Sequence, residues 1–212
     1  MEIAINEETL KERFPKLIYN KEDETIEGMM QIQCICKDEY INDIFEIKIK
    51  FFKNKIPEVF EISKKIKPSY HHLYNDGKLC LATDIEQELY LKEHDILDWI
   101  EEYIKKYFVS YIYYKRYKVF PFEEHSHGEK GINEFLKEYF VVENIDVAKN
   151  IFEYVCTKKY RGHASCPCGS NKRLRNCHGN LILNVINGKD IEILKENYRR
   201  IENVGRNKQK AK

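Results

Sequence analysis

No stretch of this sequence approaches 18 consecutive apolar residues, and its first residues lack the basic start and apolar stretch of a secretory signal. An excess of charge of one sign is also missing, because 36 Lys and Arg stand against 35 Asp and Glu, a net charge of +1. The chain as a whole therefore has no field that would attract nucleic acid or an acidic membrane. We expect a soluble, cytoplasmic protein without a membrane partner, in which any basic site is local.

Cysteine is too scarce for a disulfide scaffold, since only seven occur in 212 residues. A redox thiol protein is disfavoured, because no C-x-x-C pair exists and Cys80 has no resolving cysteine near it in sequence, although distant Cys156 could be close in space. Disorder is excluded by an apolar content of 42% and an aromatic content of 13%, which are enough to form a core.

The order of predicted elements gives the fold class. A helix over residues 7–14, ended by Pro15, precedes two strands that form a hairpin and a third, shorter strand. An irregular segment over residues 64–83 leads to a long amphipathic helix whose first amides Asp95 can cap, and further helices follow. The three strands are expected at 25–37, 45–51 and 59–62, and the later helices at 94–116, at 135–160 and after the last cysteines. Strands and helices are segregated, so we predict an α+β fold with an antiparallel meander flanked by helices.

Composition divides the chain into four parts. Residues 1–122 form the domain with the meander, and residues 123–160 form a linker and a helical extension. His125 and His127 fall in that polar linker, and we interpret them as linker residues instead of a second metal site. Residues 161–204 form a small cysteine-bearing module with a C-terminal helix, and residues 205–212 form a basic, disordered tail.

Cys80 follows a Gly-containing turn in the segment YHHLYNDGKLCL, residues 70–81. A thiolate is the nucleophilic form of cysteine, so a reactive Cys80 needs nearby donors or positive charge. His71, His72 or Lys78 could supply them if the loop folds back, and backbone amides around residues 79–83 could stabilise an oxyanion. The alternative is that Cys80 is a small buried residue between two leucines.

The order of elements and the residues Gly77-Lys78-Leu79-Cys80-Leu81 resemble the ubiquitin-conjugating enzymes, over roughly residues 1–120. The resemblance implies that Cys80 accepts, as a thioester, the C-terminal carboxylate of a ubiquitin-like protein or of a similar protein tail. Tyr70-His71-His72 stand where that family has His-Pro-Asn, so His72 would replace the asparagine that helps to stabilise the oxyanion, or would act as a general base. Such histidine-containing variants look like divergent bacterial members from conjugation and antiphage cassettes.

The chain departs from the family pattern at other positions. Pro57 stands alone where the family has paired prolines, and Trp99 falls inside a predicted helix, where we interpret it as a core residue. These departures leave the use of a separate activating enzyme open. Cys34 and Cys36 share one face of a predicted strand, which favours burial over metal binding.

The strongest motif is CPCGSNKRLRNCHG, residues 166–179. We expect its Cys166, Cys168, Cys177 and His178 to provide the four thiolate and imidazole ligands of a closed, structural zinc site, which disfavours a metallohydrolase; the alternative is that these cysteines are free surface thiols. The string resembles the SEC-C motif, a zinc-bound module used for docking to proteins and sometimes to nucleic acid. This region is locally basic because of Lys172, Arg173 and Arg175 and the cations before them. One interpretation is that it binds phosphates or an acidic partner, and the other is that it is merely a solvated face.

Two functions follow from these motifs. The first is a transferase that carries an acyl group on Cys80, with His72 assisting, and conjugates it to a target amine in antiviral defence. The resemblance implies a partner with an exposed C-terminal tail, such as the cyclic-oligonucleotide synthase of an antiphage operon. The second is a non-catalytic zinc-containing adaptor that binds protein or nucleic acid, in which Cys80 has no chemical role.

Overall fold

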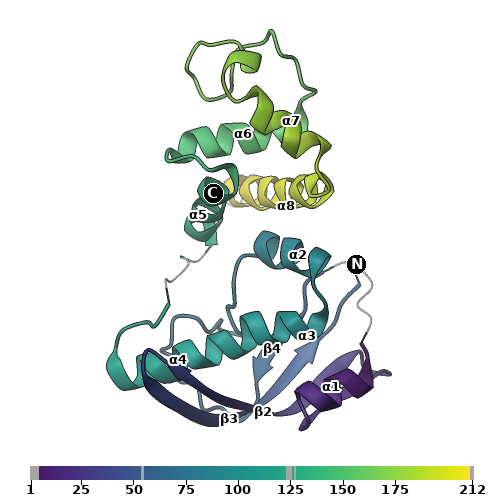
Figure 1. Cartoon of the computed structure of the whole chain (residues 1–212), viewed down its shortest axis with the longest axis vertical. Helices are drawn as coiled ribbons and strands as arrows, with labels where there is room; N and C mark the ends of the chain where they lie inside the picture. Colours follow the sequence, from purple (N-terminus) through teal and green to yellow (C-terminus); the bar gives the residue numbers. More distant parts are fainter. Residues whose placement is uncertain (1–4, 54, 123–125, 127, 211–212) are drawn as a thin grey trace. The chain divides into compact units, whose positions relative to one another are not determined.

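The computed structural model describes residues 5–53, 55–122, 126 and 128–210 and divides into two compact units (Figure 1). The first comprises Met1–Ala82 and Tyr90–Glu124, and the second comprises Thr83–Leu89 and His125–Lys212. Each unit has its own hydrophobic core. None of the helices described has the length and apolar character needed to cross a membrane.

The first unit is built on a four-stranded antiparallel sheet in the order β1-β2-β3-β4. Helix α1 (Glu7–Arg13) precedes the sheet, and the Asn6 side chain caps it by accepting hydrogen bonds from two of its first amides. The strands are β1 (Leu17–Asn20), β2 (Thr25–Cys36), β3 (Glu39–Lys50) and β4 (Glu58–Glu61). Each strand pairs with the next one in the chain, so the predicted meander and its hairpin are confirmed.

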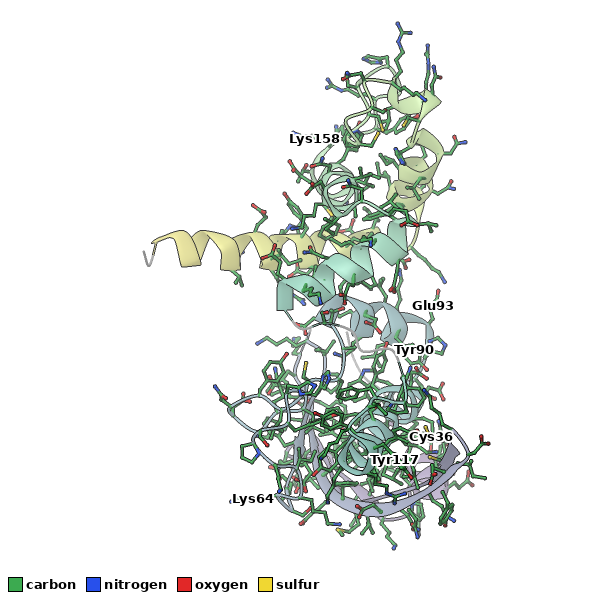
Figure 2. The ribbon with its side chains drawn as sticks, turned by 90° about the vertical axis from the view of Figure 1, so that its left-hand side faces the viewer. Cys36, Lys64, Tyr90, Glu93, Tyr117 and Lys158 are labelled. Atoms are coloured by element: carbon green, nitrogen blue, oxygen red, sulfur yellow. The ribbon has the colours of Figure 1, made fainter. Side chains whose placement is uncertain are left out.

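A long helical segment covers one face of this sheet (Figure 1). It comprises α3 (Ile96–Trp99), a π-helical stretch (Ile100–Lys105) and α4 (Lys106–Tyr117), and it begins with the predicted Asp95 cap. Trp99 is completely buried in the core, as predicted. Cys36, labelled in Figure 2, is buried on the core side of β2, and Cys34 packs against the same core. Burial raises the pKa of the Cys36 thiol, as does nearby Cys34.

Several predicted elements need correction. The short strand β1 and the helix α2 (Asp84–Glu93) were not expected. The single helix expected over residues 135–160 is two helices, α5 (Gly128–Phe140) and α6 (Ile145–Thr157). The chain turns between them, where Val141 has a positive φ of 52° and Asn144 caps the second helix.

The second unit is helical. Its core contains residues from the first turns of α2 and from four further helices: α5, α6, α7 (Gly179–Asn187) and α8 (Ile191–Lys210). A short 3-10 helix (Leu174–Asn176) precedes α7. Residues 123–160 thus contribute α5 and α6 to the same compact unit as the cysteine motif. The end of the chain differs from the expected disordered tail, because α8 continues to Lys210 and only residues 211–212 lie outside the described part.

Candidate functional site

Cys80 lies at the end of a small hairpin in the irregular segment between β4 and α2. The backbone N–H of Tyr74 donates to the Lys78 carbonyl at 2.9 Å, and the N–H of Gly77 donates to the Tyr74 carbonyl at 2.9 Å. This pattern is a three-residue hairpin loop, and Gly77 occupies its left-handed position with φ of 85°. The glycine is needed there because other residues adopt that conformation only with strain.

The hairpin places His72 directly opposite Cys80. Leu73 and Leu79 form an antiparallel bridge, and the Cys80 N–H donates to the His72 carbonyl at 2.8 Å. Leu79 is buried on the core side of the hairpin, so the side chains of His72 and Cys80, one position away on each strand, share the opposite side. Directly opposed residues of this kind have Cβ atoms about 5 Å apart. Both side chains are half-buried, and Cys80 forms no disulfide.

Two tyrosines of α4 hold this segment in place. The Tyr107 hydroxyl donates to the His72 carbonyl at 3.1 Å, the same carbonyl that accepts from the Cys80 amide. One turn later, the Tyr111 hydroxyl donates to the Lys65 carbonyl at 2.8 Å. Burial, with a smaller contribution from Tyr70, raises the pKa of Tyr107 far above its usual value, so its hydroxyl remains a donor. No sequence pattern indicated this role, because both tyrosines fall in the apolar stripe of the predicted helix.

Aromatic rings surround the two histidines. Tyr70 is buried, and its ring centroid lies 5.5 Å from that of His72 and 5.9 Å from that of Tyr107. The ring of Phe120 lies 5.7 Å from that of His72 and 5.4 Å from that of His71. His71 is exposed, whereas His72 is half-buried. The ring contacts of the two histidines are similar, so the burial of His72 and its pairing with Cys80 in the hairpin favour it over His71 as the residue held beside the thiol.

Some expected contributions to this site are not available. The Leu79 amide donates to the Val59 carbonyl at 2.8 Å, and the Cys80 amide donates to His72, so neither can serve an oxyanion. The Lys78 ammonium lies 3.7 Å from a carboxylate oxygen of Glu58 and over the Tyr74 ring, so its charge is already paired. Of the amides expected over residues 79–83, the first two are therefore excluded, and His72 is the titratable side chain placed opposite the thiol.

The second candidate site is the cysteine and histidine cluster in the second unit. One ligand atom each from Cys166, Cys168, Cys177 and His178 lies within 4.8 Å of every other. The Cys166 and Cys177 sulfurs each lie 3.3 Å from His178 Nδ1, and the Cys168 and Cys177 sulfurs are 3.5 Å apart. Ligands around a tetrahedral zinc ion are about 3.7 Å apart, given Zn–S bonds of about 2.3 Å. The four side chains predicted from the sequence can therefore hold a metal ion.

The backbone of the motif brings these ligands together between α6 and α7 (Figure 1). Ser165 and Arg173 form an antiparallel bridge, and the Cys166 amide donates to the Lys172 carbonyl at 2.9 Å, which closes a loop around Cys168. His178 ends the motif and directly precedes α7. Burial works against the Cys168 thiolate, but hydrogen bonds from the Ser170 side chain and backbone outweigh it and lower the pKa of this thiol to about 6.

The remaining candidate residues do not join either site. His125 and His127, interpreted as linker residues, lie outside the described residues. Cys156 is on α6 and is not among the four clustered ligands. Burial raises the pKa of its thiol to about 12, which disfavours the nucleophilic thiolate at neutral pH.

An antiparallel meander covered by one long helix, with a cysteine after a short hairpin, characterises the ubiquitin-conjugating-enzyme-like, or E2-like, proteins. The model of one family, the Type II CBASS E2 proteins, matches residues 6–127. The match spans more than half of the chain, and the protein belongs to this family of E2-like proteins of antiphage defence. Comparison with curated proteins and with solved structures gave no significant match.

Proposed function

We propose that Cys80 carries an acyl group as a thioester and passes it to an amine of a target protein. The observation that carries this proposal is the hairpin that sets His72 opposite Cys80, within the segment that matches the E2-like family. Cys34 and Cys36, the other cysteines of that segment, belong to the sheet strand β2 and pack on its core side. Cys80 is thus the cysteine of the matched segment that lies in a loop next to a histidine.

The reaction has two balanced steps. A free carboxylate is a poor electrophile, so the donor's C-terminal carboxyl must arrive activated, as a thioester or a mixed anhydride. The Cys80 thiolate attacks its carbonyl carbon, forming the C–S bond as the bond to the leaving group breaks. A target amine then attacks the thioester carbon, an amide forms, the amine loses a proton, and Cys80 leaves as a thiolate.

The donor is a protein with an exposed C-terminal tail, either a ubiquitin-like protein delivered by an activating enzyme or a cyclic-oligonucleotide synthase. Family membership supports a role among the proteins of such a defence system. The metal in the second unit is zinc, because three thiolates and one imidazole form the donor set that this ion prefers. With four protein ligands the site is closed, and its role is to stabilise the fold of the second unit.

Intact mass spectrometry after co-expression with these donors tests the acyl-carrier function. The wild-type chain is expected to gain the mass of the donor less one water. An excess of a small thiol should remove the adduct by thiol exchange, whereas a phosphine reductant, which cleaves disulfides, should leave it in place. The variant Cys34→Ala, which alters a half-buried cysteine of the same unit, should form the adduct normally. Stable binding of the donor without any covalent adduct would support the adaptor alternative instead.

His72 is expected to act in the second step. An imidazole opposite the thiol can donate a hydrogen bond to the oxyanion or accept the amine proton, and such groups contribute about 100-fold or more to the rate. His72→Ala should therefore form the thioester but transfer it to an amine roughly 100-fold more slowly. His72→Asn retains a donor and should recover part of the rate in a single-turnover assay. Normal transfer by His72→Ala would exclude this role.

Tyr107 is expected to position the hairpin. Tyr107→Phe removes one hydrogen bond to a carbonyl that keeps its bond from the Cys80 amide, which should lower the free energy of unfolding by about 1 kcal/mol. Tyr111→Phe removes the equivalent bond further from Cys80 and is the matched control. We expect both variants to lose similar stability but only Tyr107→Phe to slow transfer, by roughly tenfold. Equal transfer rates for the two variants would mean that Tyr107 has a structural role alone.

A further inference from the structure

A strongly basic, wholly polar surface lies beside the metal ligands of the second unit. No Asp or Glu occurs between Tyr154 and Lys189, whereas seven Lys and Arg do. These cations exceed the net charge of +1 of the entire chain, so the rest of the chain is net acidic. Positive charge is thus concentrated in this stretch. This agrees with the expectation from the composition that any basic site is local.

All seven of these cations are exposed, and the six that precede α7 form what we call the basic face: Lys158, Lys159, Arg161, Lys172, Arg173 and Arg175. None of the six forms an ion pair with a carboxylate in the described part of the chain. By contrast, Lys130 and Lys149, also in the second unit, are paired with Glu134 and Glu129. The basic face therefore presents its charge to solvent.

The backbone brings the two halves of the basic face together. The Leu174 amide donates to the Ala164 carbonyl at 2.8 Å, and the Arg175 amide donates to the Gly162 carbonyl at 3.0 Å. The segment that carries the arginines therefore lies beside the segment that follows Arg161. Leu174 is completely buried, while its neighbours Arg173 and Arg175 are both exposed. Lys158, labelled in Figure 2, directly follows α6 and begins the other half.

The absence of exposed apolar side chains from this surface indicates which class of polyanion it fits. Between residues 142 and 203 no large apolar side chain is exposed. An interface with a folded protein normally has an apolar centre, whereas interfaces with nucleic acid are polar and positively charged. Single-stranded nucleic acid is usually bound by exposed aromatic rings that stack on its bases, and this surface offers none.

We propose that the basic face binds the phosphate backbone of a nucleic-acid duplex without reading its sequence. Arginine and lysine neutralise phosphates and release counterions, so the affinity depends steeply on salt. The Ser165 side chain, exposed opposite Arg173, adds a neutral donor for a phosphate oxygen. This activity does not depend on Cys80, and it goes beyond acyl transfer.

Fluorescence anisotropy of the full chain with short labelled DNA and RNA duplexes tests the proposal. We expect micromolar affinity at moderate salt, the same for duplexes of unrelated sequence. Arg173→Ala/Arg175→Ala and, further from the metal ligands, Lys158→Ala/Lys159→Ala should each weaken binding roughly tenfold. Each should also reduce the slope of log affinity against log salt by about 1.8, which corresponds to two phosphate contacts.

The matched control is Lys130→Ala/Lys149→Ala, which removes two cations of the same unit that are already ion-paired. It should bind like the wild type, as should Cys80→Ala, which separates this proposal from the acyl-carrier function. Equal weakening by the control, absence of duplex binding, or tighter binding of a labelled poly-glutamate of equal charge would each overturn the proposal. The last result would assign the basic face to an acidic protein.

Discussion

Substitution of Cys80 by Ala is expected to lower amine acylation at least about a thousandfold, to the uncatalysed background. The thiol is the atom to which the acyl group is attached, and alanine offers no nucleophile in its place. Cys34 and Cys36 cannot substitute for it, because both lie on β2 with their side chains on the core side. Single-turnover assays with an activated donor and a small amine measure this rate directly.

Cys34→Ala is the control for this experiment, since it removes a thiol of the same unit away from the hairpin. It should retain the wild-type rate. Thermal unfolding should show that Cys80→Ala folds normally, because the half-buried thiol contributes little apolar contact. Retention of conjugation by correctly folded Cys80→Ala would contradict the covalent mechanism.

Removal of the metal is expected to have the largest effect on stability. Cys166 and Leu174 of the motif are part of the core of the second unit, so the loop that carries the four candidate ligands also completes that core. We expect the wild type to contain one zinc ion per chain. Chelation, or the variant Cys177→Ser, should remove this ion. The unfolding temperature of the second unit should then fall by roughly 10–20 °C.

Cys156→Ala is the matched control for metal removal, because this cysteine is in the same unit but outside the cluster. It should retain one zinc ion per chain. The unfolding transition of the first unit should persist in Cys177→Ser, since that unit has a separate core. Full stability of the second unit after metal loss, measured by calorimetry and elemental analysis, would exclude a structural role for the ion.

The sequence predicted best those elements whose apolar residues follow one clear period. β2 and β3 alternate buried and exposed side chains over most of their length, and the pattern is visible in the sequence. The candidate metal ligands could be predicted equally well, because all four lie within one short sequence motif. His72 and Cys80 were predicted as site residues by resemblance, but their direct opposition needed the hairpin geometry, which spacing alone does not give.

Helix α2 was missed for a physical reason. Its residues Ile85 and Leu89 pack in the second core, whereas Leu91 belongs to the first core, so its apolar residues do not form a single stripe. The four-residue strand β1 is too short to show alternation. The role of Tyr107 was also hidden, because a hydroxyl that reaches a backbone carbonyl leaves no trace in a hydrophobic pattern.

The most direct test of the central claim is tandem mass spectrometry of Cys80→Ser isolated with its donor. A serine in this position forms an oxygen ester, which resists exchange with an added thiol, whereas the wild-type thioester does not. We predict an adduct that links the donor's C-terminal carboxyl to residue 80 and survives thiol treatment. An adduct of Cys80→Ser mapped to another residue, or a thiol-labile adduct that persists in Cys80→Ala, would contradict the assignment of Cys80 as the acyl carrier.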